Sequence, residues 1–164
     1  MSENLKYFSV PELCVSNSYP KLVEVPKEGS TIYNNIVFLI QNGLDPIRQA
    51  LGQPIIVTSG YRNEKLNAAV NGSSTSNHLK GFAADIHTGN NSTDNIKIVE
   101  TILNIGIVFD EIICEGASFN NKNELISAKW IHFGLRLYNN RHKFIYTTDF
   151  KTYHPLKMTT KITK

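Results

Sequence analysis

The sequence has few cysteines, no long apolar run and no basic leader. Its two cysteines, Cys14 and Cys114, are too few for a disulfide framework and do not have the short spacings of zinc fingers. No apolar stretch reaches the length of a transmembrane helix. The N-terminus, MSENLKYFSVPEL, lacks the basic start and apolar run of a secretory signal peptide. We therefore expect a soluble domain with two reduced thiols, no insertion into a membrane and a cytoplasmic location until the protein is released.

Charge is nearly balanced, and no part of the chain is strongly basic. The net charge of +3 arises from 17 basic and 14 acidic residues that are spread along the sequence. Clusters of Lys and Arg interleaved with aromatic residues, which typify nucleic-acid surfaces, are missing, so we expect no nucleic-acid partner. With 164 residues, 41% of them hydrophobic, and with neither repeat nor linker, the chain is expected to form one domain over residues 1–164 and to be a monomer.

Three segments are predicted to be helical. Residues 9–12, Ser-Val-Pro-Glu, resemble a capping box at the start of a short N-terminal helix. From Thr31 to Leu51 apolar residues recur on one helical face, and Pro46 is expected to kink or break this helix. A third helix is expected to follow Ser92 as N-cap and to end at Gly106, where glycine suits a left-handed C-cap.

Strands are predicted mainly in the second half of the chain. Pro54–Thr58 is a short β-branched segment that leads into a turn, and Ala83–His87 reads as a second strand. Phe109–Glu115 and Trp130–Leu137 are expected to form a hairpin with a long polar connection, and Lys143–Thr148 adds a further strand. Because helices precede the main hairpin instead of alternating with strands, the sequence favours an α+β fold.

Three residues have the types and the spacing of a zinc site. His78 and Asp85 are separated by six residues, and His132 follows in the sequence Trp-Ile-His. Two imidazoles and one carboxylate suit zinc, and a site with three protein ligands leaves the fourth position for a reacting water. Taken alone the pattern is common, since most proteins of this size contain several His and Asp residues.

The surrounding sequence makes the pattern specific. Residues 76–86, SNHLKGFAADI, resemble the S-x-H-x-x-G-x-A-x-D signature of the zinc D-alanyl-D-alanine carboxypeptidases and their phage endolysin relatives. Residues 59–62, SGYR, echo the arginine motif of that family, and residues 130–132, WIH, echo the motif of its last ligand. The three motifs occur in the family's order, and the resemblance extends from about Tyr7 to about Arg141.

The resemblance implies a fold, a cofactor and a substrate. It implies a small α+β domain in which an antiparallel sheet lines a zinc cleft and helices pack outside. One Zn²⁺ per chain would be held by His78, Asp85 and His132. The substrate would be a stem peptide of bacterial peptidoglycan, whose peptide bonds the protein would hydrolyse. A phage or prophage lysis enzyme, which reaches the cell wall without a signal peptide, agrees with this reading.

The general base departs from the pattern of several family members. In those members a glutamate stands three residues before the last histidine, but that position is Lys129 here. Another branch of the family has a glutamate at the end of the preceding strand, which corresponds to Glu115. Alternation along the predicted hairpin would place Glu115 on the same face as His132, where it can act as the base. Glu111 has the same parity and is the second choice.

Two further residues are predicted to bind substrate. Arg62 follows a strand and a turn, where a guanidinium can grip a substrate carboxylate through two parallel hydrogen bonds. Ser76 would hold polar groups of the substrate, or would simply cap its own loop. Arg141 matches an Asn-Arg pair in this branch of the family, but the sequence assigns it no role beyond support of the cleft.

The sequence leaves several functions open. The same site serves a carboxypeptidase that removes a terminal D-alanine and an endopeptidase that cuts within the stem. A zinc-stabilised wall-binding module that has lost turnover is the alternative from another class, and Lys129 in place of glutamate motivates it. An amidase on the same scaffold is the third reading.

Overall fold

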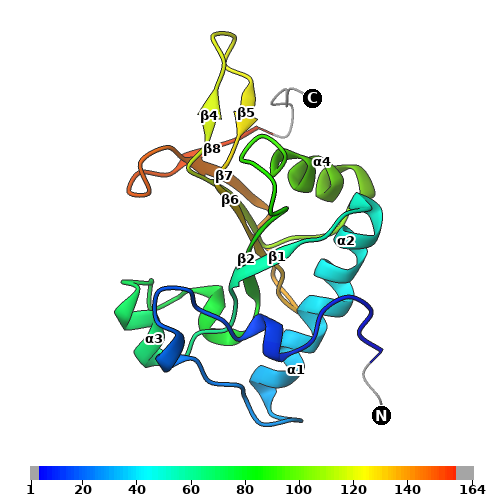
Figure 1. The fold of residues 1–164 in the computed structure, drawn as a ribbon, viewed down its shortest axis with the longest axis vertical. Helices are drawn as coiled ribbons and strands as arrows, with labels where there is room; N and C mark the ends of the chain where they lie inside the picture. Colours follow the sequence, from blue (N-terminus) through cyan, green and yellow to red (C-terminus); the bar gives the residue numbers. More distant parts are fainter. Residues whose placement is uncertain (1–3, 158–164) are drawn as a thin grey trace.

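The computed structural model describes residues 4–157, and a six-stranded sheet lies at its centre (Figure 1). The strands follow the order β1-β2-β6-β3-β7-β8, with these bounds: β1 Ile56–Ser59, β2 Ala83–His87, β3 Glu111–Glu115, β6 Trp130–Gly134, β7 Lys143–Thr147 and β8 His154–Pro155. Neighbouring strands are antiparallel except β3 and β7, which are parallel. The predicted hairpin of β3 and β6 is confirmed. Its connection contains a small second hairpin, β4 Ser118–Phe119 and β5 Leu125–Ser127, that projects from the body.

Helices pack on one side of the sheet. The helical run consists of α1 Thr31–Leu39, the π-helical turn η3 Ile40–Leu44 and α2 Asp45–Leu51, and α4 Ile96–Ile105 packs against α2. The remaining elements are α3 Glu64–Ala69 and the short 3-10 helices η1 Pro11–Leu13, η2 Pro20–Leu22 and η4 Asn77–Lys80. Figure 1 shows α3 at the opposite side of the molecule from α2 and α4. Helices and a mostly antiparallel sheet in one small domain confirm the predicted α+β class.

The two faces of the sheet have different roles, which the alternation of side chains sets. In β3, Ile112 and Cys114 are fully buried against the helices. Phe133 in β6 joins the same core, with Ile36 and Ile102 from the helices. The intervening positions of both strands face away from this core. Polar side chains at those positions are therefore free to line a site.

The irregularity predicted in the helix near Pro46 lies before this residue, at Ile40–Leu44. The irregular segment is η3, in which the backbone N–H of Asp45 donates to the carbonyl oxygen of Ile40, five residues back. Pro46 then stands in the first turn of α2, where its missing N–H costs no helical hydrogen bond. The helix accommodates its proline through the π turn, and Ile40 and Leu44 remain in the core.

Two predicted caps differ from the structure. Asn95, not Ser92, is the N-cap of α4, and its amide nitrogen donates to the carbonyl oxygens of Ala128 and Lys129. The Asn95 side chain makes no capping hydrogen bond to the helix itself, and a left-handed Gly106 ends the helix as predicted. Only half of the N-terminal capping box forms: Glu12 accepts from the backbone N–H of Ser9, but the Ser9 side chain accepts no backbone bond in return.

The ends of the predicted domain, residues 1–3 and 158–164, lie outside the described residues. Among residues 4–157, no helix combines the length and the apolar character that a membrane crossing requires.

Candidate metal centre and active site

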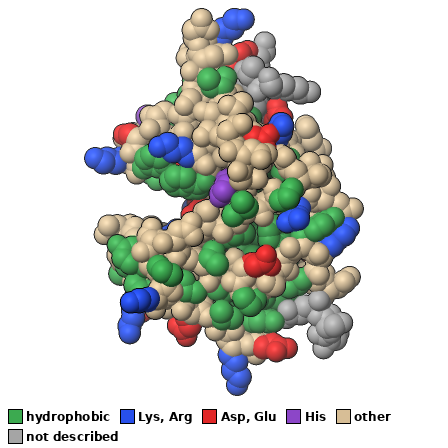
Figure 2. Space-filling model, viewed as in Figure 1, with side chains coloured by type: hydrophobic (Ala, Val, Ile, Leu, Met, Phe, Trp, Pro, Cys, Tyr) green, Lys and Arg blue, Asp and Glu red, His purple; other side chains and the backbone are tan. Residues whose placement is uncertain are grey.

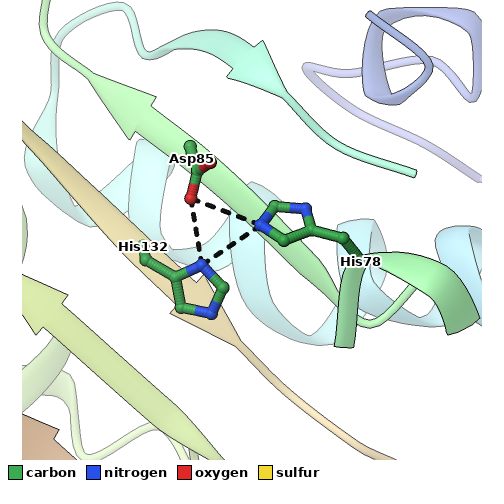
Figure 3. Close-up of side chains that lie close together, drawn as sticks. All are labelled: His78, Asp85 and His132. Atoms are coloured by element: carbon green, nitrogen blue, oxygen red, sulfur yellow. Dashed lines mark hydrogen bonds and ion pairs between the residues drawn. The ribbon is translucent and has the colours of Figure 1, made fainter. Parts of the chain in front are cut away.

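The three predicted zinc ligands meet on the open face of the sheet. His78 comes from η4, Asp85 from the middle of β2 and His132 from the middle of β6. Asp85 and His132 are direct partners across the β2–β6 ladder, so the sheet register alone brings them together. Figure 3 shows the three side chains pointing toward one another.

The distances within this group match the requirements of zinc. The Nδ1 atom of His132 lies 2.9 Å from Oδ1 of Asp85 and 3.2 Å from Nε2 of His78, and the remaining separation is 3.4 Å (Figure 3). Four ligand atoms about 2.0 to 2.2 Å from a tetrahedral zinc lie roughly 3.3 to 3.6 Å apart. Three oxygen and nitrogen donors, one from each side chain, therefore have the spacing and the chemistry to hold one zinc ion.

The orientation of His78 is fixed by a backbone contact. Its Nδ1 lies 2.7 Å from the carbonyl oxygen of Gly60, so this nitrogen carries the proton and Nε2 is left as the ligand atom. Gly60 in turn lies against η1, and a Cβ at this position would lie 2.0 Å from the carbonyl oxygen of Leu13. The Ser-Gly-Tyr-Arg motif thus needs glycine because two backbones approach closely here.

The two histidines of the centre stabilise the buried negative charge of Asp85. Burial acts to raise the pKa of Asp85, but His78 and His132 hold that pKa well below its ordinary range. Burial lowers the pKa of His78, and Asp85 opposes this effect only in part. The negative charge of Asp85 is therefore retained beside one neutral imidazole.

The Nδ1 atom of His132 faces the other two predicted ligands, and its Nε2 faces a carboxylate. Nε2 is buried and lies 3.4 Å from Oε1 of Glu111, an ion-pair contact without hydrogen-bond geometry. Burial alone would lower the pKa of His132, but the neighbouring carboxylates of Asp85 and Glu111 raise it to about 9. Since a metal needs the unprotonated Nδ1, metal and proton compete for this atom.

Glu115 lies on the same face but in different surroundings. It pairs with Trp130, two positions along the ladder from the pair of Ile113 and His132, so it is a diagonal neighbour of His132. Its side chain is buried, and within residues 4–157 it has no ion pair. Burial first, and then the charge of Asp85, raise the pKa of Glu115 to about 7. A carboxylate of this pKa is suited to exchange protons near neutral pH.

Arg62 and Ser76 both line the same cleft, but each already has a local partner. Arg62 Nη2 lies 3.3 Å from Oδ2 of Asp85, and its Nε donates to Oγ of Ser59 at 3.2 Å. The Ser76 oxygen accepts from the backbone N–H of His78 at 3.2 Å and caps η4. Both residues therefore help to place ligands, and the outer edge of the Arg62 guanidinium still borders the cleft.

A cleft of about 620 Å³ connects these side chains. The three predicted ligands, Glu111 and Glu115 line it, together with residues from segment 70–76. Trp130, Phe150 and Tyr153 line it as well. Figure 2 shows a deep cleft that opens to one side of the molecule, between the part that carries the β7–β8 turn and the part that carries α3. A chain of several residues can enter such a cleft from solvent.

The family model described as Peptidase M15 matches residues 6–111. The chain belongs to the M15 peptidase family. Members of this family are zinc peptidases, and the match includes Arg62, His78 and Asp85. It ends before Glu115 and His132, which the fold of this M15 peptidase brings beside the first two ligands. No curated protein matches the chain.

Several residues of this M15 peptidase that shape the site were not identified from the sequence. Asp110 is fully buried and binds Asn77, the neighbour of His78, and Arg141. Phe150 and Tyr153 reach the cleft from a turn near the end of the described chain. Alternation along β3 predicted that Glu111 and Glu115 share the face of His132. No such periodic pattern in the sequence identifies Asp110, Phe150 or Tyr153.

Proposed function

We propose that this M15 peptidase hydrolyses peptide bonds in the stem peptides of bacterial peptidoglycan. The observation that carries the proposal is the cluster of three ligand atoms within 4.8 Å of one another, open to a cleft that also holds the unpaired carboxylate of Glu115. The resemblance of residues 59–62, 76–86 and 130–132 to the zinc D-alanyl-D-alanine carboxypeptidases and phage endolysins supports the choice of substrate.

In this proposal each side chain has a defined task. His78, Asp85 and His132 would hold one zinc ion, and such an ion would supply Lewis-acid chemistry for a bound water and for the carbonyl group of the substrate. Glu115 accepts the proton of the attacking water and later delivers it to the leaving amine. Arg62 keeps Asp85 in place and offers its remaining N–H groups to a carboxylate of the substrate.

Lys129, which stands where several family members have glutamate, lies outside this chemistry. Its ammonium group lies 5.3 Å from the centre of the Phe150 ring, and its backbone N–H donates to the carbonyl oxygen of Glu115. The position before β6 therefore supplies no base to the cleft. Glu115 has to carry proton transfer if the protein is an enzyme and not a zinc-stabilised binding module.

Glu115→Gln tests this assignment. Glutamine keeps the shape but accepts no proton, so we expect turnover of a synthetic stem pentapeptide to fall roughly 100-fold or more. Zinc content, measured by elemental analysis, should stay near one ion per chain, because no ligand has been altered. The masses of the wild-type products distinguish removal of a terminal residue from cleavage within the stem.

Two outcomes would contradict the proposal. Full activity of Glu115→Gln would place the base elsewhere. A wild-type protein that holds zinc but cleaves no stem peptide would favour the binding module.

A further inference from the structure

The turn between β7 and β8 is held firmly at both ends. Pairing of Tyr146 with His154 closes it, and the backbone N–H of Leu156, a buried residue, donates to the carbonyl oxygen of Phe144. Within the turn, Oδ1 of Asp149 accepts from the backbone N–H groups of residues 151 and 152 at 2.9 and 2.8 Å. The turn is therefore a rigid part of the cleft, because its own side chains and its strands fix it.

Phe150 has an unfavourable backbone conformation that the turn maintains. Its φ is +60°, in the left-handed region that aromatic residues rarely adopt, and its N–H donates to Oγ1 of buried Thr147. Its ring stacks on Trp130, with centroids 5.2 Å apart and an interplanar angle of 11°. Conformations of this kind cost about 1 to 3 kcal/mol and concentrate at functional sites. The stack joins the turn to the strand that carries His132.

Tyr153 is the polar group that this turn places at the cleft. Its side chain lines the cleft with Glu115 and His132, and the residue is 46% exposed. Among residues 4–157, no hydrogen-bond partner is found for its hydroxyl group. Burial, and then the charges of Glu115 and Asp85, raise the pKa of Tyr153, so the phenol stays protonated and remains a donor.

The backbones of the two strands beside Tyr153 offer no donor to a peptide in this cleft. The backbone groups of β3 and β6 are used in ladders with strands on both sides, so they cannot pair with a bound chain. The charged side chains that raise the pKa of Tyr153 are all carboxylates. Ionised carboxylates accept hydrogen bonds but do not donate them. The same carboxylates repel an anionic group, whereas a neutral carbonyl oxygen is tolerated.

We propose that the β7–β8 turn forms a subsite for a peptide substrate on the Glu115 side of the ligands, in which the Tyr153 hydroxyl donates a hydrogen bond to a backbone carbonyl of the bound peptide. The ligand class rests on the proposed function, since it assumes that a peptide enters the cleft. Phe150 and Trp130 act as the support that holds Tyr153 in position. The turn lies outside residues 6–111, which the family model matches.

Binding measured without turnover tests the subsite. Zinc-loaded Glu115→Gln protein is titrated with a synthetic stem pentapeptide by calorimetry, alone and combined with Tyr153→Phe. Loss of one neutral hydrogen bond should raise Kd about fivefold to tenfold. The matched control is Tyr138→Phe in the same background, because Tyr138 is 79% exposed and does not line the cleft. We expect no change in Kd for this control.

The identity of the acceptor is tested with a second peptide whose C-terminus is amidated. The loss caused by Tyr153→Phe should be the same for both peptides if a backbone carbonyl is the acceptor. A loss confined to the free carboxylate overturns the carbonyl assignment, and an unchanged Kd with both peptides, or no binding at all, overturns the subsite. Tyr153-dependent binding by a protein whose wild type cleaves nothing would overturn only the proposed function.

Discussion

Glu111 and Glu115 are diagonal neighbours of His132 on the same strand, yet their surroundings differ. Burial acts to raise the pKa of Glu111, but contact with His132 and the positive charge of Arg141 hold it below its ordinary value. Lys143 also lies 3.5 Å from the Glu111 carboxylate. Glu115 has no such cation, and its pKa is raised. We therefore propose that Glu111 orients His132 and that Glu115 transfers protons.

Replacement of Glu111 should weaken metal binding. With a metal on Nδ1, the proton of His132 sits on buried Nε2, and Glu111→Ala leaves it without an acceptor, whereas Glu111→Gln keeps an oxygen there but loses the charge. Removal of such a partner typically costs 10- to 100-fold in metal affinity. We expect zinc affinity, measured by competition with a chelator, to fall in the order wild type, Gln, Ala.

Glu28→Ala is the control, because Glu28 is exposed and lies outside the cleft. It should bind zinc as the wild type does. Equal zinc affinities for wild type and Glu111→Ala would show that Glu111 has no part in positioning His132.

At the scale of single residues, sequence motifs predicted which side chains meet but not their partners. The spacing of His78 and Asp85 reflects a 3-10 helix followed by a strand, which local sequence encodes. The contact of Arg62 with Asp85 depends on the registers of β1 and β2. Tyr153 is placed by a strained turn and an aromatic stack, and neither has a periodic pattern in the sequence.

The segments around the sheet are joined by Asp110, which directly precedes β3. Its carboxylate accepts from Asn77 in η4 at 2.7 Å and from Nη2 of Arg141 at 2.6 Å, and Arg136 lies 3.2 Å away. Arg141, to which the sequence assigned no role beyond support of the cleft, therefore ties the segment after β6 to the helix that carries His78. Burial opposes ionisation of Asp110, but these contacts lower its pKa to about 2.

Asp110→Asn should destabilise the protein in a pH-dependent manner. The carboxyl has an ordinary pKa of about 3.9 in the unfolded chain. Because its folded pKa is lower, its stabilisation is complete above about pH 4 and disappears as the pH falls through about 2. Urea unfolding at pH 7 should show a loss of about 2 to 4 kcal/mol in the variant. The difference in free energy of unfolding between variant and wild type should become smaller below pH 4.

Asp149→Asn is a useful comparison for this measurement, because Asp149 also has a low pKa but lies in an exposed turn. Its effect at pH 7 should be smaller. If the loss of unfolding free energy caused by Asp110→Asn stays constant from pH 7 to pH 3, the ion-pair explanation is contradicted.

At the scale of elements, period-two alternation predicted β3 and β6 and their pairing, because both strands have one apolar and one polar face. The predicted start of α4 was wrong: Asn95 is its N-cap, and the Asn95 side chain binds residues 128 and 129, which are remote in the chain. The parallel pairing of β7 with β3 was not predicted either. Strand patterns carry no information on which edge of a sheet a later strand joins.

The whole molecule is linked through the metal centre. His78 and Asp85 belong to one stretch of chain, whereas His132 arrives from β6 only after the β2–β6 ladder has formed. In the absence of a metal, the centre holds two imidazoles and a carboxylate with little access to water. An ion that binds only the folded form stabilises the fold by mass action.

Zinc should therefore raise the melting temperature of the metal-free protein. At a free zinc concentration 1,000 times Kd the gain is about 4 kcal/mol, which corresponds to a shift of roughly 8 to 16 °C for a chain of this size. Differential scanning calorimetry with and without zinc measures the shift. His132→Ala should show little response, and an equal response in this variant would contradict the ligand assignment.

The alternation of side chains in β3 and β6 restricts how the protein can change in evolution. In each strand, residues of the site alternate with residues of the core, so insertion or deletion of one residue would turn the core positions toward the cleft and the site positions toward the helices. Such a change would disrupt the hydrophobic core and the metal site at the same time. The turn of the projecting hairpin, residues 120–124, has no such constraint, because among the described strands β4 and β5 pair with each other alone. Homologues are therefore expected to differ in length between residues 120 and 124 while β3 and β6 keep their length, with substitutions within these two strands confined to one face at a time.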